Sequence, residues 1–405
     1  MAHEVYLDNN ATTRVLPEVA DAMLPFLTEH YGNPSSIHRF GSAVGERLAR
    51  AREQVTHLLG AADPVEIIFT SCGTEGDNAA IRGMLEARPN KRHIVTTQVE
   101  HPAVLSLCQH LEKRGYRVTW LKVDENGALD LEELRSALTD DTALVSVMWA
   151  NNETGVIFPV EQIGAIVKAK GIPFHVDAVQ AAGKLHLNVK DLPVDLMTIS
   201  GHKFYAPKGV GALYVKRGLT FRPFMMGGHQ ERNRRGGTEN VAGIIGMGAA
   251  AEIAASRIDS DAARITKLRD QLETLLLGSC PGSRINGGAQ KRLPNTCNMS
   301  FRYLEGESIL VLLDQQGVCA STGSACTAGS SEPSHVLRAM KVPPDWLQGA
   351  VRFSLGRFNT EEEIAYVNEK MPKIVQRLEG LSSLGKLAGQ RTEDPSAGVT
   401  MRARG

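Results

Sequence analysis

An excess of charge of one sign is absent from this sequence. Its 405 residues include 45 Lys and Arg against 45 Asp and Glu, so the formal net charge is zero. Proteins that bind nucleic acid or anionic membranes carry clustered positive charge, and the basic run at 231–235 is too short to form such a surface. We therefore expect neither nucleic acid nor a membrane among the partners.

Long apolar runs are also absent. A membrane-spanning helix needs about 20 consecutive apolar residues, whereas the most apolar stretch, 241–255, is rich in Gly and Ala and contains Glu252. Such a stretch is typical of a tightly packed helix. The first residues have neither the basic nor the apolar part of a secretory leader, so we expect a cytoplasmic protein.

Cysteine is scarce, and no two cysteines have the Cys-x-x-Cys spacing of common metal and redox sites. In a reducing compartment such thiols stay free unless they do chemistry. The spacing argues against an intrinsic metal site and against a scaffold that holds an iron–sulfur cluster. The six cysteines are Cys72, Cys108, Cys280, Cys297, Cys319 and Cys326.

Strand-like and helix-like segments alternate between about 65 and 215. Most of the predicted strands are continuous apolar runs, as expected for strands buried on both faces. This alternation predicts an α/β fold with a mostly parallel sheet. The predicted strands are 66–70, 93–97, 117–123, 143–150, 173–179, 196–200 and 210–215. The predicted helices are 75–88, 102–114, 131–138 and 160–170.

The C-terminal third has a different pattern. A charged helix is followed by apolar runs at 296–301, 308–313 and 351–354 and by a last helix, a mixture that indicates a smaller α+β domain. We predict a large domain over 15–260, a small domain made of 1–14 and 261–383, and a disordered tail over 384–405.

Ligands bind outside the carboxyl ends of the strands in an open α/β sheet, so residues that follow the predicted strands are candidates. Gly73 and Thr74 stand where a loop of small residues enters a helix. That arrangement suits a phosphate, because free N–H groups and the helix dipole face it, or a plain helix cap. His101 precedes another helix, as a catalyst or a cap. Asn152 could orient a ligand or build a turn.

Two charged residues belong to predicted buried strands or their ends. Asp177 lies within an apolar strand, and an unpaired buried carboxylate is costly. A cation should face it, either a protonated pyridine nitrogen or the cation of a structural salt bridge. Lys203 follows another strand, where a buried amine can lose its proton and form a Schiff base. Ser200 and His202 flank it as candidate phosphate donors.

Two further candidates lie in the C-terminal part. Cys326 lies in a stretch of Gly, Ser, Ala and Thr. Because cysteine is usually buried, a cysteine in such a loop is either a reactive thiol or an accidental exposed one. Arg352 lies in an apolar strand and needs a carboxylate partner. That partner could be an amino-acid substrate or an acidic side chain of the protein.

Together, these segments resemble a cysteine desulfurase of the aminotransferase class V family, within fold type I of the pyridoxal-phosphate (PLP) enzymes. They follow the family's order over residues 5 to about 360. The matching segments are 6–13 (YLDNNATT), 32–36 (GNPSS), 72–75 (CGTE), 99–102 (VEHP), 151–155 (NNETG), 175–180 (HVDAVQ), 200–203 (SGHK) and 323–326 (GSAC).

The resemblance implies a large domain with a mostly parallel seven-stranded sheet and assigns roles to residues. Lys203 would bond covalently to PLP, Asp177 would pair with the pyridine nitrogen, and Cys326 would receive the sulfur. At the PLP ring, the resemblance implies that Gln180 would contact the ring oxygen, that His101 would stack on the ring and move protons, and that Asn152 would orient the ring or substrate. The phosphate would be bound by Gly73, Thr74, Ser200 and His202, and Thr238 from the second subunit of a homodimer would complete this site. Arg352 would bind the substrate carboxylate.

The implied reaction removes sulfur from L-cysteine, giving L-alanine and a persulfide on Cys326. An iron–sulfur scaffold protein would accept the sulfur, and Cys326 would be at most a transient iron ligand through its persulfide. The stretches 149–155, 227–232 and 332–340 are most similar to the nitrogen-fixation branch, and 384–405 lack the acidic and aromatic tail of housekeeping members. The resemblance therefore favours supply for nitrogenase. Alternatives on the same fold are a housekeeping desulfurase for iron–sulfur clusters or tRNA thiolation, a selenocysteine lyase and an aminotransferase.

Overall fold

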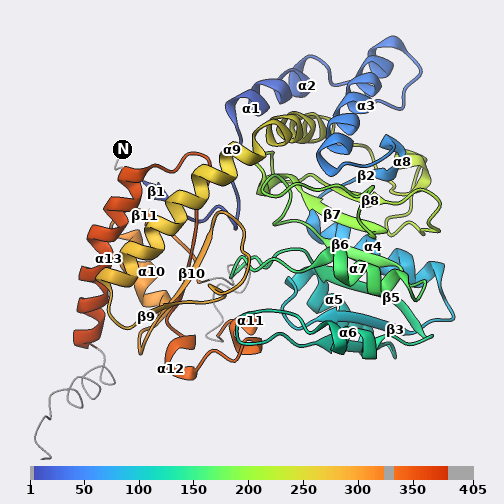
Figure 1. Cartoon of the computed structure of the whole chain (residues 1–405). Helices are drawn as coiled ribbons and strands as arrows, with labels where there is room; N and C mark the ends of the chain where they lie inside the picture. Colours follow the sequence, from blue (N-terminus) through green and yellow to red (C-terminus); the bar gives the residue numbers. More distant parts are fainter. Residues whose placement is uncertain (1–3, 323–332, 382–405) are drawn as a thin grey trace, which may run out of the picture.

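The computed structural model describes residues 4–322 and 333–381. A seven-stranded sheet forms its larger half (Figure 1), in the order β2-β8-β7-β6-β5-β3-β4. Neighbouring strands are parallel except at β8, which is antiparallel to both β2 and β7. The strands are β2 (Ile67–Thr70), β3 (His93–Thr97), β4 (Arg117–Leu121), β5 (Thr142–Met148), β6 (Phe174–Asp177), β7 (Leu196–Ser200) and β8 (Gly211–Val215).

The reversal at β8 follows from the length of its connection. Only residues 201–210 separate β7 from β8. A parallel pairing needs a crossover of a dozen or more residues, whereas a short loop returns the chain antiparallel. The connections from β3 to β4, from β4 to β5 and from β5 to β6 contain helices, whereas the longer connection from β6 to β7, over 178–195, is built of turns. The strand pairs β3–β4, β3–β5, β5–β6 and β6–β7 are parallel.

Both faces of the sheet are covered, because its strands contribute side chains to two different cores. In β2, Ile67 and Phe69 belong to one core, and Ile68 belongs to the other. The first core also receives side chains of α3, α6, α7 and α9, and the second those of α4 and α5. This period of two with burial on both sides explains why the strands are continuous apolar runs in the sequence. The helices are α3 (Arg39–Leu59), α4 (Gly73–Ala87), α5 (Pro102–Glu112), α6 (Leu131–Ala137), α7 (Val160–Lys168) and α9 (Val241–Ser279).

Two short helices precede α3, and α8 (Gln230–Asn233) precedes α9. The short helices are α1 (Pro17–Met23) and α2 (Pro25–Thr28). Together with α3 they project from the upper edge of the molecule in Figure 1.

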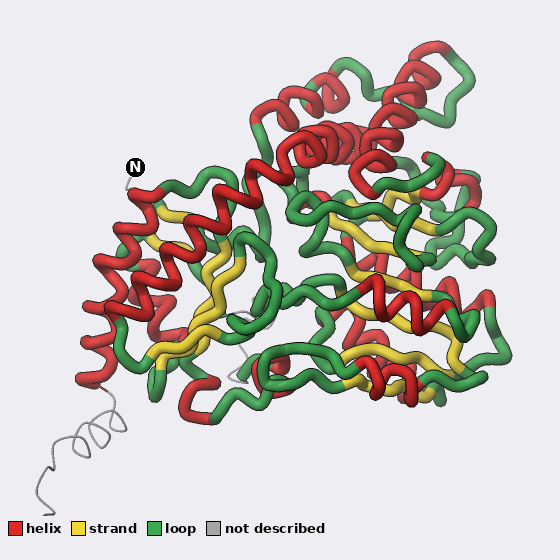
Figure 2. The backbone as a smooth tube through the Cα atoms, viewed as in Figure 1, coloured by secondary structure: helices red, strands yellow, loops and turns green. Residues whose placement is uncertain are grey.

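A separate hydrophobic core lies in the smaller half (Figure 2), where helices flank short strands. Its three-stranded sheet has the order β12-β10-β9, and β1 pairs in parallel with β11. The N-terminal strand therefore lies beside a segment more than 300 residues later in the chain. The elements are β1 (Val5–Tyr6), β9 (Ser283–Ile285), β10 (Thr296–Phe301), α10 (Gly306–Asp314), β11 (Val318–Cys319), α11 (His335–Ala339), α12 (Pro344–Leu347), β12 (Ala350–Ser354) and α13 (Glu361–Leu381).

Helix α9 joins the two halves. Ala254 and Ile258 pack in the core of the large sheet, whereas Ile265 and Leu272 pack in the core of the smaller half. By length and composition alone this helix could cross a membrane, but 56% of its most apolar window is buried inside the molecule. Buried core helices pass the same test.

The prediction of an α/β fold with a mostly parallel seven-stranded sheet is confirmed. All seven predicted strands are present, with ends that differ by a few residues. The apolar runs 296–301 and 351–354 are strands, but 308–313 is part of helix α10. Short apolar runs do not distinguish a strand from a buried helix.

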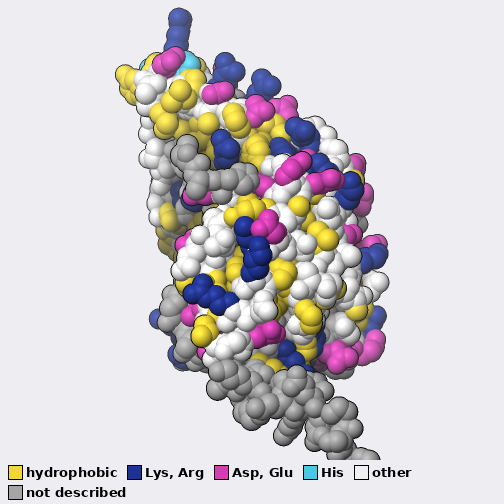
Figure 3. Space-filling view, turned by 90° about the vertical axis from the view of Figure 1, so that its left-hand side faces the viewer, with side chains coloured by type: hydrophobic (Ala, Val, Ile, Leu, Met, Phe, Trp, Pro, Cys, Tyr) yellow, Lys and Arg dark blue, Asp and Glu magenta, His cyan; other side chains and the backbone are white. Residues whose placement is uncertain are grey.

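Charges of both signs are interspersed on the side of the molecule that carries α13. Figure 3 shows Lys and Arg side chains among Asp and Glu side chains and uncharged surface on this face. The equal numbers of acidic and basic residues are thus mixed locally as well.

Candidate active site

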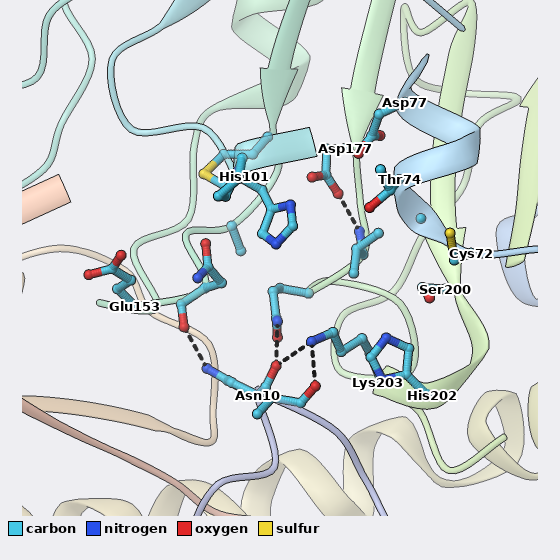
Figure 4. Close-up of a pocket in the computed structure, with 18 of the residues that line it drawn as sticks. Asn10, Cys72, Thr74, Asp77, His101, Glu153, Asp177, Ser200, His202 and Lys203 are labelled. Atoms are coloured by element: carbon cyan, nitrogen blue, oxygen red, sulfur yellow. Dashed lines mark hydrogen bonds between the residues drawn. The ribbon is translucent and has the colours of Figure 1, made fainter. Parts of the chain in front are cut away.

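A cavity of about 320 Å³ lies at the carboxyl ends of the parallel strands. The residues after β2, β3 and β5, and the last residues of β6 and β7, converge on it from one edge of the sheet (Figure 4). Residues of the smaller half, among them Asn10 and Arg352, close another side. The lining comprises Asn10, Ala11, Cys72, Gly73, Thr74, Asp77, His101, Pro102, Met148, Ala150, Asn152, Glu153, Asp177, Val179, Gln180, Ser200, His202, Lys203, His335 and Arg352.

The N-terminal segment positions Lys203. The Lys203 Nζ atom donates to the carbonyl oxygens of Asn10 at 2.6 Å and Ala11 at 2.8 Å. The Asn10 carbonyl also accepts from Gln180 Nε2 at 3.0 Å. Gln180 is oriented in turn by Lys184, whose Nζ donates to Gln180 Oε1 at 2.9 Å. The Asn10 carbonyl therefore accepts hydrogen bonds from both the Lys203 amine and the Gln180 amide at the floor of the cavity.

Asp177 ends strand β6 with its side chain at the cavity. Its Oδ1 atom accepts from the backbone N–H of Val179 at 2.9 Å. Burial raises the pKa of Asp177 to about 6. The hydrogen bond from the N–H of Val179 and the positive charge of Lys203 act in the opposite direction and lower this pKa. At neutral pH this carboxyl is therefore mostly ionised, and it favours a cation in front of it.

His101 is both a helix cap and a cavity residue. Pro102 starts helix α5, and the backbone N–H of Ala103 donates to His101 Nδ1 at 3.1 Å. Because Nδ1 accepts this bond, the hydrogen of the neutral ring lies on Nε2. Burial, assisted by Lys203, lowers the pKa of His101 to about 4, so the imidazole is neutral at physiological pH.

The start of helix α4 faces the cavity without a side-chain cap. Cys72 holds the capping position but accepts no hydrogen bond there. A Cβ atom on Gly73 would lie 2.8 Å from Val179 Cγ2 and 3.9 Å from Ser200 Oγ, so only glycine leaves this space open. The Ser200 Oγ atom is buried and has no hydrogen-bond partner among the described residues. Buried polar groups are nearly always paired, so an external acceptor is expected here.

Arg352 reaches the cavity from strand β12 of the smaller half. Its Nη2 atom lies 2.7 Å from Asp8 Oδ1, and its Nη1 atom donates to the carbonyl of Asn152 at 3.0 Å. The side chain is 2% exposed. The carboxylate partner that its burial required is thus present within the chain, and the guanidinium still lines the cavity.

Comparisons with known proteins identify the family of this chain. The aminotransferase class V family profile matches residues 5–367. A cysteine desulfurase of Trichormus azollae is 60% identical over 378 residues, which are 93% of this chain and 94% of that protein. The cysteine desulfurase NifS of Azotobacter vinelandii is 53% identical over 392 residues, 97% of each chain. The chain belongs to the cysteine desulfurases of the aminotransferase class V family.

Solved structures of similar proteins share the fold. A NifS-like protein superposes with a TM-score of 0.88 at 42% identity, over 93% of this chain and 100% of its own. SspA in complex with cysteine has a TM-score of 0.78 at 32% identity, over 88% of this chain and 100% of its own. The prediction of a cysteine desulfurase with the fold-type I architecture is confirmed by these relatives.

The desulfurase fold brings most of the predicted site residues together. The remaining two predicted residues are Cys326 and Thr238. Cys326 lies outside the described residues. Thr238 is exposed in the segment between α8 and α9, as a residue that serves another subunit would be, so its role stays a prediction. The predicted residues that line the cavity are Gly73, Thr74, His101, Asn152, Asp177, Gln180, Ser200, His202, Lys203 and Arg352.

Sequence reasoning missed four polar residues of this cysteine desulfurase site: Asn10, Asp77, Glu100 and Glu153. Asp77 and Glu153 line the cavity together with Asn10, and Glu100, which precedes His101 in the chain, is fully buried. The three acidic residues are buried. Glu100 and Glu153 lie within the segments 99–102 and 151–155, and Asp77 lies just after the segment 72–75. An acidic residue on the apolar face of α4 was the clearest available signal.

Proposed function

We propose that the chain binds PLP in this cavity and transfers sulfur from L-cysteine to Cys326. The supporting observation is the unpaired Ser200 hydroxyl beside the uncapped start of α4. A phosphate accepts hydrogen bonds, so it would satisfy both this hydroxyl and the free N–H groups of the helix. The residues present therefore fit PLP, with its phosphate held by Gly73, Thr74, Ser200 and His202, and by Thr238 of a second subunit.

The remaining residues suit the ring and its linkage. Asp177 provides the negative charge for a pyridinium nitrogen, Gln180 offers an amide for the ring oxygen, and the neutral His101 ring can stack and carry a proton on Nε2. When bound through Lys203, PLP supplies an electron sink for the carbanion formed at the substrate Cα. The Lys203 amine would serve as the base that removes the substrate Cα proton.

Arg352 would hold the substrate carboxylate, with Asn152 beside it. Asp8 and the Asn152 carbonyl fix the guanidinium plane at the cavity wall, which reduces the entropy lost when a carboxylate binds. The Cys326 thiolate would then attack the substrate sulfur. The C–S bond breaks with its electron pair on carbon, which takes a proton to give alanine, and the sulfur atom stays on Cys326 as a persulfide.

We propose further that the sulfur is passed to an iron–sulfur scaffold protein, for nitrogenase. Support comes from the identity of 53% with the NifS of Azotobacter vinelandii over nearly the whole of both chains. A housekeeping role in iron–sulfur or tRNA sulfur supply and a selenocysteine lyase activity are the alternatives. Free cysteines among the described residues fit a cytoplasmic location.

A homodimer and two domains are also proposed. The exposed Thr238 and the exposed apolar side chains of Leu24, Leu27 and Tyr31 support a dimer, because large exposed apolar patches mark interfaces. Separate hydrophobic cores support a large domain over 15–260 and a small one over 1–14 and 261–383. Val336 and Leu337, which this division assigns to the small domain, pack in the core of the large one.

Incubation of the PLP-loaded protein with L-cysteine tests the proposal. We expect alanine to form and the Cys326 peptide to gain the mass of one sulfur atom. Cys326→Ser should keep the absorbance of the lysine-linked PLP and lose alanine and sulfide formation by at least about a hundredfold, because the nucleophile is gone. Cys319→Ser, seven residues earlier in strand β11, is the matched control. This variant should keep the PLP absorbance and should still form alanine and sulfide.

Two results would count against this scheme. Sulfide release by Cys326→Ser at the native rate would exclude the persulfide mechanism. An iron–sulfur spectrum without a borohydride-sensitive PLP band would favour a cluster-binding scaffold instead.

A further inference from the structure

We propose that Asp77 is a positioning residue that lies behind Asp177 and carries a proton. The pyridine nitrogen then faces a single negative charge, that of Asp177; this inference rests on the proposed PLP function. Asp77 is 1% exposed and lies on α4, one turn after Gly73 and Thr74. Figure 4 shows its carboxyl group on the same side of the cavity as that of Asp177.

A close approach of α4 to strand β7 holds Asp77 in this place. A Cβ atom on Gly76 would lie 2.6 Å from Thr198 Cγ2, so the absence of a side chain at 76 lets the helix press against β7. Asp77, the next residue, then meets Thr198, which is hydrogen-bonded to its carboxyl group. The helix that would hold the phosphate and the strand that leads to Lys203 thus jointly position this acid.

A buried chain of hydrogen bonds continues from Thr198 away from the cavity. Thr198 Oγ1 lies 3.0 Å from His175 Nε2, and His175 Nδ1 lies 2.9 Å from Ser146 Oγ. His175 Nε2 is 3.6 Å from Asp77 Oδ1, beyond hydrogen-bonding distance. Burial lowers the pKa of His175 to about 3, so the imidazole is neutral and provides no positive charge for Asp77.

The titratable groups that raise the pKa of Asp77 are all acidic. Asp177 on β6, Glu100 in the loop after β3 and the Cys72 thiol at the start of its own helix all raise the pKa of Asp77, in addition to burial, which is the largest cause. Its Oδ1 atom has no hydrogen-bond partner among the described residues. Two buried carboxylates in one site do not both ionise.

The environment decides which of the two keeps the proton. Asp177 accepts a backbone N–H bond and feels the positive charge of Lys203, whereas Asp77 has a neutral hydroxyl partner and acidic neighbours. Asp177 is therefore the anion and Asp77 the acid. Because Asp77 is protonated, no second negative charge lies beside Asp177. The Asp77 hydroxyl can also donate a hydrogen bond.

The charge state can be tested by comparing Asp77→Asn with Asp177→Asn. Asn resembles a neutral carboxyl group, so Asp77→Asn should leave the PLP dissociation constant within about threefold of the native value, since no charge is lost. Asp177→Asn removes the negatively charged partner of the pyridinium and should raise the PLP dissociation constant by about a hundredfold. Equal losses in the two variants would overturn the inference, because they would make Asp77 an anion.

A second measurement needs no PLP. In the infrared spectrum of the apoprotein at neutral pH, labelling with carbon-13 aspartate separates aspartate carboxyls from Glu100. We expect a protonated aspartate band that Asp77→Asn removes and that Thr198→Val, which keeps Asp77 but deletes its hydroxyl partner, shifts. Absence of that band from the native apoprotein would overturn the inference, even if Asp77→Asn does not fold. Failure of the native protein to bind PLP would instead refute the proposed function, and the infrared result would still decide the state of Asp77.

Discussion

Glu100 is a buried carboxyl group whose protonation should control how the stability of the apoprotein depends on pH. Its side chain is 0% exposed. The Oε1 atom accepts from Thr97 Oγ1 at 2.7 Å and from the backbone N–H of Met148 at 3.1 Å. The Oε2 atom is buried without a hydrogen-bond partner in the described part of the chain. We predict that Glu100→Gln flattens the stability–pH profile.

The magnitude follows from the pKa. Burial raises the pKa of Glu100 from 4.5 to about 8. The folded state therefore holds this proton more tightly than the unfolded state, so the contribution to stability is complete below pH 4.5 and is lost as the pH rises through 8. Each pH unit in this window removes about 1.4 kcal/mol, up to about 5 kcal/mol in all. Glutamine does not titrate, and its Oε1 can accept the same two bonds.

Urea unfolding of the apoproteins between pH 4.5 and 9 measures this directly. The difference in unfolding free energy between Glu100→Gln and the native protein should increase with pH in favour of the variant. Glu132→Gln, at a carboxylate 80% exposed on α6, is the control and should follow the native profile. If Glu100→Gln and the native protein lose stability in parallel as the pH rises, then Glu100 is already ionised in the folded state and the reasoning fails.

Two further substitutions test the close packing at Gly73 and the buried ion pair between Glu231 and Arg52. Gly73→Ala should weaken PLP binding by about tenfold or more, since its Cβ would lie 2.8 Å from Val179 Cγ2; Gly278→Ala, which meets open space, should bind PLP normally in the same titration. Glu231→Gln should cost about 3–5 kcal/mol of unfolding free energy, because Glu231 forms a buried two-bond pair with Arg52 at 2.7 and 2.8 Å. Combining it with Arg52→Met should cost less than the sum of the single changes, and strict additivity would show that the pair is not coupled.

The sequence was sufficient to predict the strands of the large sheet, because strands buried on both faces leave continuous apolar runs. It was also sufficient to predict that Lys203, Asp177 and His101 would meet, since they lie at or just after the carboxyl ends of strands that share one edge. It was insufficient for 308–313, whose apolar run is equally compatible with a strand. The run in fact forms a helix with Ile309 and Leu313 buried in the smaller core.

The partners of the site residues depended on the tertiary structure. Arg352 and Asp8 are 344 residues apart in the chain, and no local pattern links them. The same holds for Lys203 and the carbonyls of Asn10 and Ala11, which meet because the N-terminal segment crosses between the two cores. Asp77 was missed because an acid on a helix is ordinarily at the surface. Packing of α4 against β7 at Gly76 is what buried it.

The sequence by itself therefore determined the strands of the large sheet, the family and the candidate residues at the strand ends, because these follow from apolar periodicity and from motifs local in the chain. Only the tertiary structure decided the charge states. The pKa of Asp77, Asp177, Glu100 and His101 depends on burial and on neighbours brought together from distant segments. Desolvation acts on a group through everything that surrounds it, and that surrounding exists only in the folded chain.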